Sequence, residues 1–204
     1  MTTRRDFLRT TAGVGAGTAR GVVPVSKLSG APSILTRRVT PTSVGSANGR
    51  AAVAKAVEIG VTDPDRIGVV GGSAGAHLAG LLATTADVLE LHGEGGHPGV
   101  SSEVQAAVVM SGPMEIATGS VAERSLIPDA PKPNARWLFG GNVEEVPELY
   151  ALADAHAHID EDTPPILFQY GGTEDPSKVA NSVEKLRSLS IPTEVLSRYP
   201  DGKH

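Results

Sequence analysis

Four short apolar runs alternate with segments of helical periodicity along the chain after about residue 48. The runs cover residues 67–70, 106–110, 166–170 and 193–199. The first run is largely β-branched and shows no polar alternation, which is typical of a strand covered on both faces in a parallel sheet. We therefore predict strands at these positions, paired in parallel.

Helices are expected between the strands, because parallel strands must be joined by crossover connections. Asn48 is suited to cap a helix over residues 50–59, and Gly60 to end it. The other segments with helical periodicity are residues 74–85, 146–153 and 176–188. Strands that alternate with helices, without an internal repeat, predict a three-layer α/β domain with a mostly parallel sheet.

The first 46 residues do not share this pattern. Arg4 and Arg5 precede an apolar pair and a small, uncharged stretch, an order that resembles a twin-arginine export signal; the alternative is a basic, unstructured N-terminus. The following residues are rich in Pro, Ser, Thr and Gly, which indicates a linker. We predict an export signal over residues 1–20, a linker over 21–46, a folded domain over 47–204, and a periplasmic or secreted bacterial protein.

Composition narrows the function further. A chain of 204 residues with 40% apolar residues suffices for one domain with a buried core. The net charge of -5 disfavours a nucleic-acid partner. The absence of cysteine excludes disulfides, thiolate metal sites and cysteine nucleophiles. No later stretch reaches the roughly 20 apolar residues of a membrane-spanning helix, so no membrane anchor is expected.

A Gly-x-Ser-x-Gly pattern lies between the first predicted strand and the helix after it, formed by Gly71, Gly72, Ser73, Ala74 and Gly75. In this context the serine can sit on a strained turn that exposes its hydroxyl as a nucleophile. Flanking glycines are expected because a β-carbon there would collide with the neighbouring strand or helix. The Ala74 N–H, at the start of the helix, would point toward a developing oxyanion.

Glycine-rich turns between a strand and a helix have two other uses in proteins. A glycine-rich turn can be purely structural, or it can cradle phosphate, but the spacing of a dinucleotide-binding or P-loop motif is absent. We favour Ser73 as a nucleophile. His77 is expected to be a packed core histidine rather than its partner.

Residues 63–67, which run into residues 71–78, resemble the α/β-hydrolase superfamily, specifically bacterial esterase and lipase-like members related to acetylxylan and feruloyl esterases. The similarity extends from about Gly49 to His204. It implies a Ser, Asp, His triad in that chain order, with the acid after the next-to-last strand and the histidine after the last.

By this resemblance, Asp175 corresponds to the acid and His204 to the base. Asp175 could instead cap the helix that Pro176 opens, and Glu174 is the nearest rival for the acid. His204 is the final residue, a position that is often frayed. We expect no metal and no organic cofactor: the histidines at positions 156 and 158, and those at 92 and 97, lack a third ligand at a suitable spacing.

The resemblance also shows what is missing. Family members carry strands and an oxyanion motif before the nucleophile, and no segment here matches them, so the second oxyanion donor is unassigned and activity is expected to be weak. The strand at residues 67–70 would then form an exposed edge, which favours self-association.

The sequence thus predicts a serine carboxylesterase for small acyl esters, with plant-polysaccharide esters as one substrate class. The alternatives are a truncated, non-catalytic remnant and a serine peptidase of the same superfamily.

Overall fold

The computed structural model describes residues 45–92, 99–171 and 174–198. The predicted export signal and nearly all of the predicted linker lie outside these ranges. Within them, no helix is long and apolar enough to cross a membrane.

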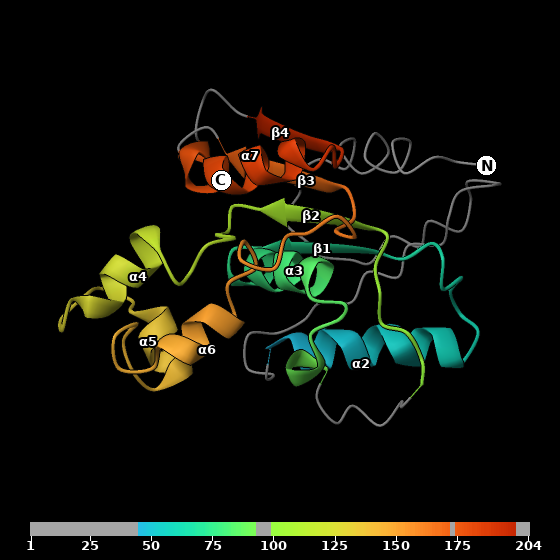
Figure 1. The fold of residues 1–204 in the computed structure, drawn as a ribbon, viewed down its shortest axis with the longest axis horizontal. Coiled ribbons are helices and arrows are strands. Elements are labelled where there is room, and N and C mark those ends of the chain that lie inside the picture. The colour runs from blue at the N-terminus through green and yellow to red at the C-terminus, as the bar shows by residue number, and fades with distance from the viewer. Residues whose placement is uncertain (1–44, 93–98, 172–173, 199–204) are drawn as a thin grey trace.

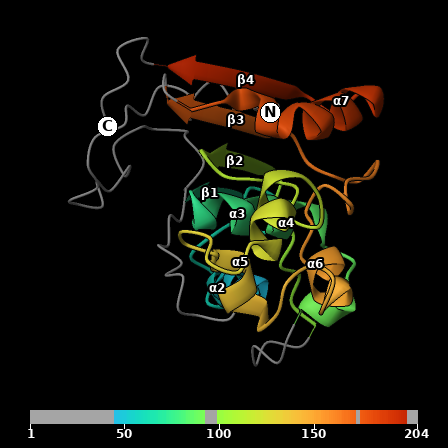
Figure 2. The same cartoon turned by 90° about the vertical axis from the view of Figure 1, so that its left-hand side faces the viewer.

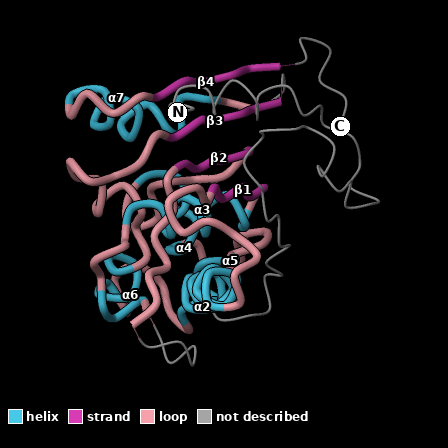
Figure 3. Tube along the Cα trace, turned by 90° about the vertical axis from the view of Figure 1, so that its right-hand side faces the viewer, coloured by secondary structure: helices cyan, strands magenta, loops and turns pink. Residues whose placement is uncertain are grey.

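The centre of the fold is a parallel sheet of four strands in the order β1-β2-β3-β4 (Figure 1). The strands are β1 (Gly68–Gly72), β2 (Ala106–Met110), β3 (Ile166–Gly171) and β4 (Thr193–Arg198). All the predicted strands are confirmed, with ends that differ by at most two residues. Each strand pairs with the next one along the chain, and the strands lie side by side (Figure 3). All of the pairings are parallel, so the carboxyl ends share one edge of the sheet (Figure 2).

Helices follow the strands as expected, with two corrections. The predicted helices correspond to α2 (Gly45–Glu58), α3 (Ala74–Thr84), α6 (Pro147–Leu152) and α7 (Ala180–Ser188). The prediction that Asn48 caps the first helix was wrong, because α2 begins at Gly45 and includes the last two residues of the predicted linker. The predicted helix over residues 176–188 begins as a 3-10 turn, η2 (Pro176–Val179), before α7.

Three short elements were not predicted. These are η1 (Leu89–Leu91), α4 (Gly119–Leu126) and α5 (Asn134–Phe139). In Figures 1 and 2, α4, α5 and α6 gather with α2 on the β1 side of the sheet, away from β4. A turn or two of helix has too few residues for a clear periodicity. The local feature that marks α5 is Gly140, which ends the helix in the left-handed conformation, as glycine often does.

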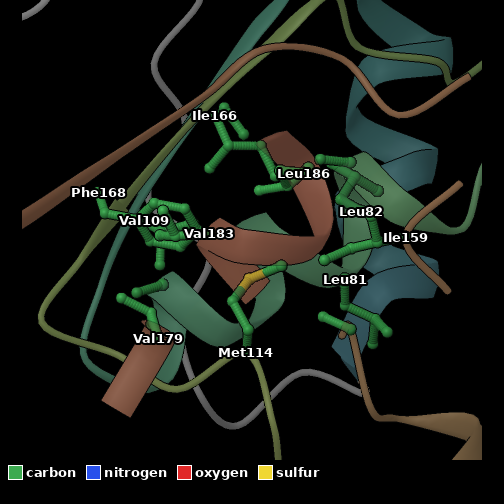
Figure 4. Close-up of a cluster of buried hydrophobic side chains, with 14 of the residues drawn as sticks. Leu81, Leu82, Val109, Met114, Ile159, Ile166, Phe168, Val179, Val183 and Leu186 are labelled. Atoms are coloured by element: carbon green, nitrogen blue, oxygen red, sulfur yellow. The ribbon is translucent and has the colours of Figure 1, made fainter. Parts of the chain in front are cut away.

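The main core lies between one face of the sheet and the helices α3 and α7. Its largest members include Phe168 and Ile166 from β3 and Leu186 from α7, all fully buried (Figure 4). Because side chains alternate along a strand, Val108 and Leu167 point to the opposite face, where they form a second, small cluster. The α/β class, with a parallel sheet and flanking helices, is therefore confirmed.

A buried arginine attaches α2 to the end of α3. Arg50 donates to both the backbone carbonyl and the hydroxyl of Thr85, and also to the Ser102 hydroxyl at 3.2 Å. Burial lowers the pKa of Arg50, while the charges of Asp87 and Glu103 oppose that shift. The helix that precedes β1 is thus fixed to the helix that follows it.

Among the described residues, β1 pairs only with β2. Val70 of β1 is 38% exposed. Self-association along this strand remains a prediction.

Candidate active site

Ser73 is the single residue between β1 and α3, and its backbone is strained. Its φ is 55° and its ψ is -121°, a conformation that residues with a side chain rarely adopt. The Ser73 N–H donates to the Met110 carbonyl at 2.8 Å, and the Ser73 carbonyl accepts from the Ala76 N–H at 2.9 Å. The residue is exposed, and its hydroxyl forms no capping bond with α3. The turn therefore presents the Ser73 hydroxyl at the carboxyl edge of the sheet.

The glycines around Ser73 are not equally constrained. A β-carbon on Gly71 would lie 1.8 Å from the Gly75 carbonyl oxygen, so only glycine fits there. At Gly72 and Gly75 a β-carbon would meet nothing within 4 Å. The expectation that flanking glycines avoid collisions is confirmed at Gly71 and wrong at the other two, since the chain packs against itself on only one side of the turn.

Gly112, which the sequence did not single out, also supports this turn. It follows β2 by two residues, and a β-carbon there would lie 2.5 Å from the Ser73 carbonyl oxygen and 2.4 Å from the Ala76 β-carbon. The chain beyond β2 is thus in close contact with the turn that carries Ser73. Only the tertiary fold could reveal this glycine, since it belongs to no local motif.

Ala74 is the first residue of α3 and is exposed. Its N–H belongs to the unpaired donors at a helix N-terminus, where the partial positive charge of the helix is concentrated. Its service as an oxyanion donor remains a prediction.

Asp175 lies at the same edge of the sheet, four residues after β3 ends, and is exposed. Its Oδ1 accepts a hydrogen bond from the Ser177 N–H at 2.9 Å, so Asp175 caps η2, as the alternative interpretation expected. Hydrogen bonding from Ser177 holds the pKa of Asp175 below its usual value. The residue is therefore a carboxylate at neutral pH, and its part in a triad remains a prediction.

Glu174, the alternative candidate for the acid, has side-chain contacts that differ from those of Asp175. Its Oε2 accepts from the Ser111 hydroxyl, just beyond β2, and from the Gly171 N–H at 3.0 Å. Glu174 is half-buried, whereas Asp175 is exposed. No local pattern in the sequence indicates Ser111 as its partner, because the two residues are far apart along the chain.

His204 and the turn that precedes it lie outside the described residues, so their distance from Ser73 is not defined. The last residue of β4, Arg198, is paired in register with Gly171. The chain thus leaves β4 at the edge of the sheet where Ser73 and Asp175 lie.

The remaining histidines of the described part have structural partners. His77 is 9% exposed and lies 2.7 Å from the Ala153 carbonyl, so its assignment to the core is confirmed. Burial lowers the pKa of His77. His156 lies 3.1 Å from the Ser182 hydroxyl and His158 lies 2.9 Å from the Leu152 carbonyl. Within the described residues, no group of three or more potential ligands is arranged to hold a metal ion.

The helical segment between β2 and β3 exposes several large apolar side chains. Trp137 is 71% exposed and Leu138 is 65% exposed. Of the two aromatic residues of α5, Phe139 and not Trp137 packs against another ring: the ring centroids of Phe139 and Tyr150 are 4.7 Å apart.

A parallel sheet with flanking helices, and a strained serine between a strand and a helix, define the class of α/β-hydrolases. The model of the BD-FAE family matches residues 53–188, and the chain therefore belongs to this α/β-hydrolase esterase family.

Sequence similarity to a carboxylic ester hydrolase agrees with this assignment. The chain is 29% identical over 150 residues to the probable carboxylic ester hydrolase LipM of Mycobacterium tuberculosis, a match that covers 70% of this chain and 32% of that protein. The chain thus spans about a third of the length of this relative.

Solved structures are similar as well. A bifunctional GH43-CE protein of Bacteroides eggerthii superimposes with a TM-score of 0.66 at 25% identity, over 81% of this chain and 25% of that one. An acetyl ester-xyloside bifunctional hydrolase of Caldicellulosiruptor lactoaceticus gives a TM-score of 0.56 at 26% identity, over 78% and 55% of the two chains. A truncated carbohydrate esterase from gut microbiota shares the fold, with a TM-score of 0.61 at 22% identity, over 74% and 58%.

Proposed function

We propose that this chain is a serine carboxylester hydrolase that acts on small acyl esters. The observation that carries the proposal is the backbone of Ser73, held at a φ of 55° between a parallel strand and a helix. Such strain costs about 1 to 3 kcal/mol and persists only where the surrounding structure enforces it. Membership of an esterase family supports a nucleophilic role for this exposed hydroxyl.

In the proposed reaction, the Ser73 oxygen attacks the ester carbonyl while His204 removes the hydroxyl proton. The Ala74 N–H donates to the oxyanion of the tetrahedral intermediate. His204 then protonates the departing alcohol, which leaves an acyl group on Ser73. Water, deprotonated by His204, attacks the acyl group, and the carboxylic acid is released as Ser73 recovers its proton. No metal or organic cofactor takes part in these steps.

Asp175 is proposed to orient the imidazole of His204 and to stabilise its cation. Two observations support this role: the residue follows β3 at the carboxyl edge of the sheet, and its lowered pKa keeps it ionised. A carboxylate that caps η2 through Oδ1 still has its second oxygen, Oδ2, to accept a hydrogen bond from an imidazole N–H.

Esters of plant polysaccharides, such as acetyl or feruloyl esters, are the proposed substrate class. Support comes from the relative that is named an acetyl ester-xyloside hydrolase and from the carbohydrate esterase that shares the fold.

The direct test combines turnover of p-nitrophenyl acetate with covalent labelling by a fluorophosphonate. Ser73→Ala is expected to lower turnover at least about 1,000-fold and to abolish labelling, because it removes the nucleophile. Ser120→Ala, which changes an exposed serine in α4, is the matched control and should retain both. An unlabelled, aggregated wild-type chain would support the non-catalytic remnant, and cleavage of amides in preference to esters would support the peptidase.

We also propose that the protein is exported through its twin-arginine segment. Arg4→Lys combined with Arg5→Lys should keep the protein in the cytoplasm with its N-terminus intact, because this pathway recognises both guanidinium groups. Processing and export that continue in this double variant would refute the proposal.

A further inference from the structure

Glu174 joins the ends of β2 and β3 through one carboxylate oxygen. Its Oε2 accepts from the Ser111 hydroxyl and from the Gly171 N–H at 3.0 Å. The Glu174 N–H in turn donates to the Gly171 carbonyl at 3.0 Å. Hydrogen bonds to an ionised acceptor are roughly twice as strong as neutral ones, so this carboxylate holds its own turn and ties it to Ser111.

The end of β2 is equally tied to the turn that carries Ser73. The Ser73 N–H donates to the carbonyl of Met110, the residue that precedes Ser111. Gly112, which follows Ser111, lies directly against the Ser73 carbonyl, where a β-carbon would be only 2.5 Å away. Ser111 therefore sits between the two segments that bear the proposed nucleophile and the proposed acid.

Two further hydrogen bonds join β3 to the chain just beyond β2. The Tyr170 hydroxyl donates to the Gly112 carbonyl at 2.9 Å, and the Ser111 N–H donates to the Gln169 carbonyl at 2.9 Å. Burial, and then the charge of Glu174, raise the pKa of Tyr170 to about 12, so its hydroxyl keeps its proton over the working range of an esterase. These two hydrogen bonds hold the chain beyond β2 against β3 in addition to the contacts of Glu174.

Within residues 45–92, 99–171 and 174–198, the hydrogen bonds of the Asp175 carboxylate are local: the Ser177 N–H donates to its Oδ1 at 2.9 Å, and the Ser177 side chain also bonds to it. Because Ser177 belongs to the same turn as Asp175, these contacts do not fix the position of Asp175 relative to Ser73. Glu174, the adjacent residue, is the one whose side chain reaches across to β2. The location of the Asp175 carboxylate relative to Ser73 thus depends on the residue before it.

We propose that Glu174 is a positioning residue, which through Ser111 sets the place of the Asp175 carboxylate relative to Ser73. This inference rests on the proposed esterase function. Catalytic geometry is sensitive to such placement, since a misplacement of about 1 Å can lower a rate about 100-fold. Glu174 is assigned no contact with substrate.

The first part of the test compares Glu174→Ala with Glu174→Gln in the full chain, with p-nitrophenyl acetate as substrate. Glu174→Ala should lower kcat about 10-fold to 100-fold and leave KM within about twofold, because the acid is displaced while the ester site is kept. Glu174→Gln should recover most of kcat, because its amide oxygen can accept the same two hydrogen bonds. Glu184→Ala, an exposed glutamate of α7, is the matched control and should not change kcat.

The second part asks whether Glu174 acts through Asp175. In an Asp175→Asn background, where kcat has already fallen, adding Glu174→Ala should lower it by less than about twofold further, because interacting residues are not additive. Ser111→Ala should give part of the loss seen in Glu174→Ala, and the double variant should be no worse than Glu174→Ala. A role in stability alone would give additive losses that follow the melting temperature of each variant.

Three results would overturn the inference. The first is an unchanged kcat in Glu174→Ala, and the second is a full, additive loss when Asp175→Asn is also present. The third is a Glu174→Gln variant as inactive as Asp175→Asn, which would make Glu174 itself the acid of the triad. Failure of the proposed function would look different: the wild-type chain would show neither Ser73-dependent turnover nor labelling of Ser73.

Discussion

The turns after β1 and β2 each hold a serine at a positive φ, but the two serine hydroxyls differ in what they contact. Ser73 and Ser111 both have a φ of 55°, and both lie at the carboxyl edge of the sheet. Ser73 is exposed, whereas the Ser111 hydroxyl is committed to Glu174. The Ser73 hydroxyl forms no capping bond with the helix that follows it, whereas the Ser111 hydroxyl donates to a carboxylate beyond the end of β3. A strained serine is therefore not by itself the mark of a nucleophile.

What distinguishes the two turns is the element that follows each serine. Ser73 is followed at once by α3, whose unpaired N–H groups can stabilise negative charge. Ser111 is followed by residues 112–118, which contain no helix. Asp154 holds part of that loop, since its Oδ2 accepts from the Ile116 and Ala117 N–H groups at 3.0 and 2.8 Å.

The largest expected effect on stability concerns the close backbone contact between Gly71 and Gly75 beside Ser73. Gly71→Ala should destabilise the fold by about 3 kcal/mol or more, because its β-carbon would overlap the Gly75 carbonyl, and backbone atoms cannot move aside cheaply. Gly72→Ala, one residue closer to Ser73, should change stability by less than about 1 kcal/mol, because nothing lies within 4 Å. Denaturant unfolding of the two variants measures the difference. Equal losses would mean that the turn is not packed as described.

A pH-dependent effect of intermediate size concerns the first turn of α3. The pKa of His77 is lowered by burial from its ordinary value of 6.5, so below about pH 6.5 the unfolded chain binds more protons at this residue than the folded chain does. The contribution of His77 to stability is complete above about pH 7 and declines as the pH falls below 6.5, by up to about 1.4 kcal/mol per pH unit.

His77→Gln is the control for this effect, because its amide N–H can still donate to the Ala153 carbonyl but does not titrate. The difference in unfolding free energy between wild type and His77→Gln, measured at pH 7.5 and pH 5.5, should shrink at the lower pH. A constant difference would show that His77 can be protonated in the folded protein at no cost.

The smallest expected effect is a gain in stability on replacing a serine that has a positive φ at the end of a helix, for comparison with Ser73. Ser190, just after α7, has a φ of 61°. Ser190→Gly should stabilise the fold by about 0.5 to 1 kcal/mol, because glycine adopts this conformation without strain, and should leave ester turnover unchanged. Ser73→Gly should give a gain of similar size while it abolishes turnover. A loss of stability in both variants would remove the strain on which the comparison rests.

The sequence by itself determined the strands, the glycine-rich turn that carries Ser73, the proposed nucleophile, and the class of fold. These are local properties: an apolar run of a few residues, a glycine-rich turn and the helix after it are readable within about ten positions. The same is true of the cap at Asp175, where an acidic residue precedes a proline. Short helices such as α4 and α5 escaped prediction, because their few residues contain little periodicity.

Only the tertiary structure decided which side chains meet across the sheet. Ser111 and Glu174 are 63 positions apart, and their hydrogen bond exists because β2 and β3 are paired in register. The close contact of Gly112 with Ser73, and the freedom of Gly72 beside the crowded Gly71, likewise depend on how distant backbones approach. Local sequence specifies what each turn can do, and the parallel pairing of strands determines which turns act together.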